Sequence, residues 1–76
     1  MPVSSIIKEL LIKKKITQTE LAKKLGTTRQ NLNNKMSRNN FTTTELYQIS
    51  QALNVELLIK DNDGTEYNIK YELEQR

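Results

Sequence analysis

Residues 17–36 decide the fold of this chain, and they read TQTELAKKLGTTRQNLNNKM. Their pattern predicts two short helices joined by a tight turn at Gly26, because a residue without a Cβ easily adopts the left-handed conformation that ends a helix. Thr17 and Glu20 have the spacing of a capping box, in which each side chain satisfies a free N–H of the first turn. Thr27 and Gln30 repeat this spacing, so each helix has its own start signal.

The apolar residues of the same stretch place one face of each helix inward. Leu21 and Leu25 are four positions apart in the first helix, and Leu32 and Met36 are four apart in the second, so each pair shares a helix face. Ala22 is small enough to let the two helices approach closely. This arrangement is typical of a helix-turn-helix motif.

Length and composition limit the protein to a single small domain. The chain has 76 residues, 36% of them hydrophobic, and contains neither Cys nor His. It therefore cannot form a disulfide, and it lacks the commonest metal ligand and general base. No run approaches 18 apolar residues and no signal-peptide pattern follows Met1, so we expect a cytoplasmic protein without a membrane partner.

Charge is distributed unevenly along the chain. Residues 1–40 contain nine Lys and Arg and two Glu, a net charge of +7, whereas residues 41–76 contain three Lys and Arg and seven Asp and Glu, a net charge of −4. The basic part contains the helix-turn-helix pattern, as expected for a surface that meets phosphate. The alternative is an ordinary solvated basic surface.

One further helix is predicted on each side of the motif. The first begins at a Ser4 or Ser5 cap, ends near Lys14, and carries an apolar stripe. The members of that stripe are Ile6, Ile7, Leu10 and Leu11. After a polar loop over residues 37–40, Thr42 and Glu45 form another capping box, and this last helix runs to about Leu53, with Asn54 as a left-handed stop.

The pattern changes to a period of two at Val55, which predicts a β-hairpin. Apolar side chains recur at every second position in residues 55–59 and 67–73, and Asp61-Asn62-Asp63-Gly64 between these segments has the composition of a turn. The predicted fold is therefore mainly α, with four helices followed by a C-terminal hairpin.

No catalytic or metal-binding constellation is found. The acidic residues around the hairpin turn do not fit a calcium loop, because Gly64 falls at position four from Asp61 instead of position six. With only two glycines there is no phosphate-binding loop, and a Ser–His or Cys–His pair is impossible. We therefore expect no enzyme activity, no cofactor and no metal.

These residues allow a family to be named. The stretch from about Ser5 to Val55, two thirds of the chain, resembles the phage Cro and repressor type of helix-turn-helix protein, the XRE family. The motifs that carry the resemblance are TQxxLAxxLGTT at 17–28 and LxxIxxALNV at 46–55. The family often has an apolar residue at the position of Lys35 and Glu at that of Met36. It also commonly has a fifth helix where this chain has a hairpin. The hairpin is similar to the β-type dimerisation element of Cro.

The resemblance implies a DNA-binding domain over residues 1–54 and a dimerisation hairpin over 55–76. The expected base-contacting residues on the second helix of the motif are Thr28, Arg29, Gln30, Asn33 and Asn34. Their chemistry agrees, since Arg suits guanine, Gln and Asn suit adenine, and the Thr methyl suits thymine. The expected phosphate-contacting residues are Gln18, Asn31, Lys35, Arg38, Asn39 and Asn40. The alternative for this polar run is a merely solvated helix face.

The hairpin offers an apolar face for a second copy of the chain. Its members are Val55, Leu57, Ile59, Tyr67, Ile69, Tyr71 and Leu73. A single hairpin cannot bury all of them, so they either pair two copies or only cover the helical core. We expect a homodimeric repressor of phage or mobile-element type that binds double-stranded DNA at a palindromic operator. The alternative is an antitoxin-like module whose acidic hairpin binds a partner protein, which would bind no DNA at any salt concentration.

Overall fold

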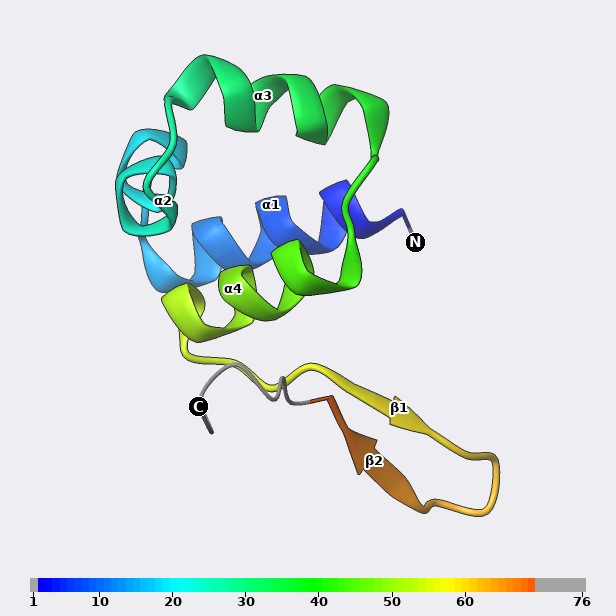
Figure 1. The fold of residues 1–76 in the computed structure, drawn as a ribbon. Helices are drawn as coiled ribbons and strands as arrows, with labels where there is room; N and C mark the ends of the chain where they lie inside the picture. The colour runs from blue at the N-terminus through cyan, green and yellow to red at the C-terminus, as the bar shows by residue number, and fades with distance from the viewer. Residues whose placement is uncertain (1, 70–76) are drawn as a thin grey trace, which may run out of the picture.

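The computed structural model describes residues 2–69 as four helices followed by two strands. The elements are α1 (Val3–Lys14), α2 (Gln18–Leu25), α3 (Arg29–Arg38), α4 (Thr43–Leu53), β1 (Leu58–Lys60) and β2 (Glu66–Asn68). The helices form one body, and the hairpin of β1 and β2 extends from it beyond the end of α4 (Figure 1). The mainly α fold with a C-terminal hairpin is thereby confirmed.

The hydrophobic core lies where the four helices meet. Its buried members are Ile7, Leu11, Leu21, Ala22, Leu32, Met36, Ile49 and Leu53. Three of them, Leu21, Leu32 and Leu53, are at most 2% exposed and come from α2, α3 and α4. The helix α2 packs against both α3 and α4, so it fixes the position of α3 relative to the rest of the domain.

Two of the predicted helix starts are confirmed atom by atom. Thr17 Oγ1 accepts from Glu20 N at 3.1 Å while Glu20 Oε1 accepts from Thr17 N at 2.9 Å, and Thr42 and Glu45 form the same pair of bonds at the start of α4. The predicted helix stop at Gly26 is also confirmed, with a φ of 74°. These signals act within one turn of the chain, which is why the sequence reveals them.

The predicted cap of α3 is wrong by one residue. Thr28, and not Thr27, is the N-cap, and its Oγ1 accepts from Asn31 N at 3.1 Å. Thr27 still belongs to the preceding turn, because its N–H donates to Ala22 O at 2.9 Å and completes the end of α2 around Gly26. Gln30 consequently lies outside the capping position and forms no box. The helix also continues through Ser37 and Arg38, which were expected to be loop.

The start of α1 differs from the prediction as well. Pro2 is the N-cap and makes no side-chain bond, so neither Ser4 nor Ser5 is the cap. Ser4 is buried instead, and its hydroxyl donates to Met36 O at 2.6 Å. Asn39 Oδ1 accepts from Ser4 N at 2.9 Å. These bonds hold the first turn of α1 against the C-terminal end of α3, a tertiary role that no local pattern in the sequence encodes.

The apolar stripe of α1 is narrower than predicted. Ile7 and Leu11 are buried and Leu10 is half-buried, but Ile6 is 44% exposed. Ile7 and Leu11 are four positions apart and define the core-facing direction, and Ile6 lies about 100° around the helix from Ile7.

Ser4→Ala tests the contact between α1 and α3. We expect it to lower the free energy of unfolding by about 0.5–1.5 kcal/mol, because the buried hydrogen bond from the Ser4 hydroxyl to Met36 O is lost while the Asn39 N–H still donates to that oxygen. Urea denaturation measures this loss, and Ser5→Ala on the next position is the control. Equal stabilities for the two variants would contradict the assigned role of Ser4.

The hairpin has the predicted turn but shorter strands than the alternating pattern suggested. Leu58 pairs with Asn68, Ile59 with Tyr67, and Lys60 with Glu66. Gly64, with a φ of 97°, lies in the turn and donates from its N–H to Asp61 O at 2.9 Å.

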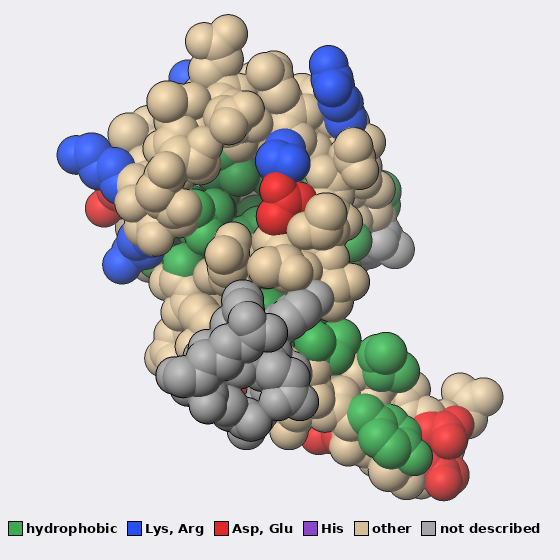
Figure 2. Space-filling view, viewed as in Figure 1, with side chains coloured by type: hydrophobic (Ala, Val, Ile, Leu, Met, Phe, Trp, Pro, Cys, Tyr) green, Lys and Arg blue, Asp and Glu red, His purple; other side chains and the backbone are tan. Residues whose placement is uncertain are grey.

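The apolar face of the hairpin divides into two parts. Val55 packs against the helical core, and Leu57 and Ile69 are half-buried. Farther out, Ile59 is 63% and Tyr67 58% exposed, and they face each other across the strands. Figure 2 shows hydrophobic side chains on the projecting hairpin and acidic ones gathered at its tip. Tyr71 and Leu73, the remaining predicted members, lie outside the described residues.

Candidate nucleic-acid interface

The outer surface of α3 is a continuous polar stripe. Gln30, Asn33, Asn34 and Ser37 follow the spacing i, i+3, i+4, i+7 that puts side chains on one helix face, and all four are exposed. The opposite face of α3 carries Leu32 and Met36, which are buried. The packing of these two residues in the core therefore fixes the direction in which the polar stripe faces.

The N-terminal end of α3 adds two more of the predicted base-contacting residues. Arg29 is the first residue of the helix and is exposed. Thr28 is exposed too, but its hydroxyl oxygen accepts the capping bond from Asn31 N. The methyl group and the hydroxyl proton of Thr28 are thus the parts left for a ligand.

On one flank the stripe meets the start of α2. Gln18 is the first residue of α2 and is half-buried. Its Nε2 donates to Asn33 Oδ1 at 3.4 Å, a distance longer than that of a typical hydrogen bond, so the interaction is weak. The structure thus brings together a predicted phosphate-contacting residue and a predicted base-contacting residue, one from each helix of the motif.

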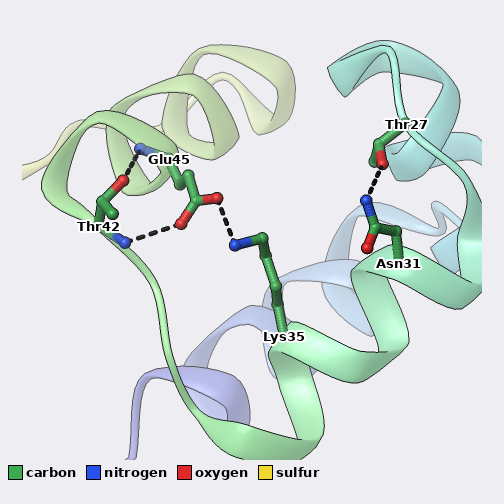
Figure 3. A network of polar contacts seen from close by, with 5 residues as sticks. All are labelled: Thr27, Asn31, Lys35, Thr42 and Glu45. Carbon is green, nitrogen blue, oxygen red and sulfur yellow. Dashed lines mark hydrogen bonds and ion pairs between the residues drawn. The ribbon is translucent and has the colours of Figure 1, made fainter.

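On the other flank, two predicted phosphate-contacting residues are engaged with neighbouring elements. Asn31 Nδ2 donates to Thr27 Oγ1 at 3.0 Å. Lys35, one turn further along α3, forms an ion pair with Glu45 of α4, with Nζ and Oε2 2.6 Å apart. Figure 3 shows both side chains reaching from α3 toward these partners, and Glu45 also closing the capping box with Thr42.

The ion pair affects the protonation of its acidic member. The hydrogen bond from the Lys35 side chain, followed by that from the Thr42 N–H, lowers the pKa of Glu45 below its ordinary value. The pKa of Glu20 is lowered in the equivalent box of α2, chiefly by its bond from the Thr17 N–H. Both carboxylates are therefore ionised at neutral pH.

The C-terminal end of α3 carries the last predicted phosphate-contacting residues. Arg38 and Asn40 are exposed. Asn39 adopts a left-handed conformation with a φ of 51° and uses its Oδ1 to accept from Ser4 N. Next to them is a shallow polar hollow of about 170 Å³ lined by Asn31, Asn34, Lys35, Arg38 and Asn40.

The sequence patterns do not predict one residue of this surface and one residue that lies beside it. Ser37 was assigned to a loop, although its spacing from Asn33 and Asn34 would have placed it on the stripe had α3 been extended to Arg38. Glu45 was recognised only as a cap. Its pairing with Lys35 joins two helices, and such a contact leaves no periodic signal in the sequence.

Comparison with known protein families agrees with this geometry. The helix-turn-helix family model matches residues 7–59, which is more than half of the chain. The chain therefore belongs to the helix-turn-helix family, in its Cro and repressor (XRE) type, whose domain binds DNA in transcription regulation. Searches of curated proteins and of solved structures found no match. No helix in residues 2–69 is long and apolar enough to cross a membrane.

Proposed function

We propose that the chain is a repressor, of phage or mobile-element type, that binds a palindromic operator as a homodimer with α3 in the major groove. The observation that carries this proposal is the exposed amide-rich stripe of α3, held rigidly by the buried face of the same helix. Amide side chains bind adenine edges bidentately, and their low helix propensity makes them poor choices for a merely solvated surface.

Base readout is assigned to five residues at the exposed surface of α3. They are Thr28, Arg29, Gln30, Asn33 and Asn34. Gln18 is assigned to a backbone phosphate because it begins α2, where free N–H groups and the helix dipole attract anions. Arg38, Asn39 and Asn40 are assigned to phosphate at the other end of α3.

The hairpin is the proposed dimerisation element. Ile59 and Tyr67 form an apolar pair that the helices of the same chain leave exposed. The sheet has only two strands among the described residues, so its outer backbone groups remain available for pairing. Two domains joined in this way would read half-sites about one helical turn apart.

Selection of bound sequences from a random double-stranded DNA pool tests the function directly. We expect enrichment of one palindromic consensus whose half-sites lie roughly 10 base pairs apart, or a multiple of that spacing. A consensus without two-fold symmetry would contradict the dimer, and the absence of any enriched sequence would contradict specific readout.

Arg29→Ala is expected to weaken binding to the selected operator by about 1–3 kcal/mol per half-site and to relax specificity at one base pair, because a bidentate contact with guanine is lost. Competition titrations with operator variants measure both effects. The control is Lys13→Ala, which removes the same charge from an exposed position on α1. Unchanged discrimination by the Arg29 variant would place this residue outside the groove.

A second candidate function is an antitoxin-like protein module. The observation that favours it is the acidic hairpin tip, where Asp61, Asp63 and Glu66 are all exposed. A basic partner protein would suit this surface. DNA titrations at decreasing salt concentration separate the two functions. The affinity of a DNA-binding protein for DNA rises steeply as the salt concentration falls, whereas a protein-binding module binds no DNA at any salt concentration.

A further inference from the structure

Lys35 differs from the other cationic residues of α3 because its ammonium group forms an ion pair with Glu45. Among residues 2–69 it is the one ion pair within 4.0 Å. The Lys35 side chain is 41% exposed and that of Glu45 is 29% exposed, so the pair lies at the surface and not in the core. An exposed ion pair of this kind contributes little to the free energy of unfolding, so its main effect is on the position of the Lys35 side chain.

Lys35 lies between two surfaces of the domain. It lines the polar hollow of about 170 Å³ together with Asn34 and Arg38. It also lines a second hollow, of about 160 Å³, together with Phe41 and Glu45 on the α4 side. A change of lysine rotamers would therefore bring its ammonium group from Glu45 to the surface that carries the predicted phosphate contacts.

The contacts of the neighbouring turn point in the same direction. Asn31, four positions before Lys35 on the same helix face, donates from its Nδ2 to Thr27 Oγ1 at 3.0 Å. This face of α3 is thus engaged with the turn and with α4 (Figure 3). Within residues 2–69, the exposed side chains of Gln30, Asn33 and Asn34 form no hydrogen bond with either of these elements, and this stripe is the part of α3 proposed to meet DNA.

We infer that Glu45 limits the affinity of the domain for the DNA backbone by holding Lys35 away from phosphate. This inference rests on the proposed DNA-binding surface and names a residue that lies outside it. Glu45 acts as a positioning residue through Lys35, and the phosphate contacts of the unaltered protein at this end of α3 come from Arg38 and its neighbours. Lys35 is then a latent phosphate contact that becomes available when the charge of Glu45 is removed.

The test is the salt dependence of DNA affinity for the full chain and Glu45→Gln. Glutamine still closes a capping box, so the start of α4 is retained. We expect the slope of log K against log salt to steepen by about 0.9 for each bound domain, the value for one more phosphate contact on duplex DNA, and so by about 1.8 for the dimer. If the affinities converge at 1 M salt, this corresponds at 0.1 M salt to roughly eightfold tighter binding for each domain.

Two further variants show whether Lys35 is responsible. Lys35→Met combined with Glu45→Gln removes both charges, and we expect its slope to equal that of the unaltered protein. Glu20→Gln removes the same charge from the other Thr–Glu capping box, where none of the described residues forms an ion pair with the carboxylate. It should steepen the slope less than Glu45→Gln does. Circular dichroism checks that all variants are folded.

Three outcomes would overturn the inference. An unchanged slope for Glu45→Gln would show that Glu45 does not hold Lys35 away from phosphate. A slope for the double variant that is shallower than that of the unaltered protein by about 0.9 for each domain would show that Lys35 already contacts DNA despite Glu45. Failure of the unaltered protein to bind DNA at any salt concentration would overturn the proposed function as well, and it is distinguishable because no slope exists to compare.

Discussion

Ile59→Asp is expected to produce a folded monomer whose affinity for the palindromic operator is lower by about 10²- to 10⁴-fold. Ile59 is 63% exposed and faces Tyr67, so its replacement removes little from the helical core but places a charge in the proposed dimer surface. Without the dimer each half-site must bind its domain independently, and the gain from linking two binding events is lost. Sedimentation equilibrium gives the oligomeric state, and operator titration gives the affinity.

Asn68→Asp is the matched control for this experiment. It introduces the same charge into the same hairpin, but Asn68 neighbours Tyr67 on β2 and so points to the opposite face of the sheet. We expect Asn68→Asp to remain dimeric. If Ile59→Asp also remained dimeric, the hairpin face would only cover the chain to which it belongs, and dimerisation would need another surface.

Leu21→Ala is expected to lower the free energy of unfolding by about 2–5 kcal/mol, the cost of removing a buried leucine side chain and leaving a cavity. Leu21 is 0% exposed and belongs to the helix that packs against both α3 and α4. A domain of 76 residues has roughly 4–11 kcal/mol of stability, so the loss is a large fraction of the total and should lower the Tm by about 10 °C or more. Urea and thermal denaturation followed by circular dichroism measure the loss.

Lys23→Ala provides the comparison on the same helix, because Lys23 is exposed and alanine is at least as good a helix former. Its stability should stay within about 0.5 kcal/mol of the unaltered protein. If Leu21→Ala lowered the free energy of unfolding by no more than Lys23→Ala does, the core would not be organised around α2.

The parts of this fold that the sequence predicted correctly are those encoded within one turn of helix or hairpin. The boxes at Thr17 and Thr42, the stop at Gly26 and the turn at Gly64 each depend on neighbours three or four positions away. Patterns of this range are visible in the sequence, because the interacting residues occur at fixed spacing.

The parts that the sequence did not predict depend on contacts between distant segments. The start of α3 moved from Thr27 to Thr28 because the Thr27 N–H completes the end of the preceding helix. Ser4 is a tertiary donor and not a cap, because Met36 O happens to lie within its reach.

For the candidate site, the exposed stripe of α3 follows from helical periodicity alone. The engagement of Lys35 by Glu45 does not, because the two residues come from different helices.

The contact of Ser4 with Asn39 also has a consequence for the kinetics of folding. The two residues are 35 positions apart, and their hydrogen bond closes a loop that contains all of α2 and α3. The entropy of closing such a loop must be lost before its non-local contact can form, so we expect this bond to form late in folding. Its loss should then speed unfolding and leave the folding rate nearly unchanged. We therefore expect the C-terminal end of α3 to dock late in folding and to be released early in unfolding.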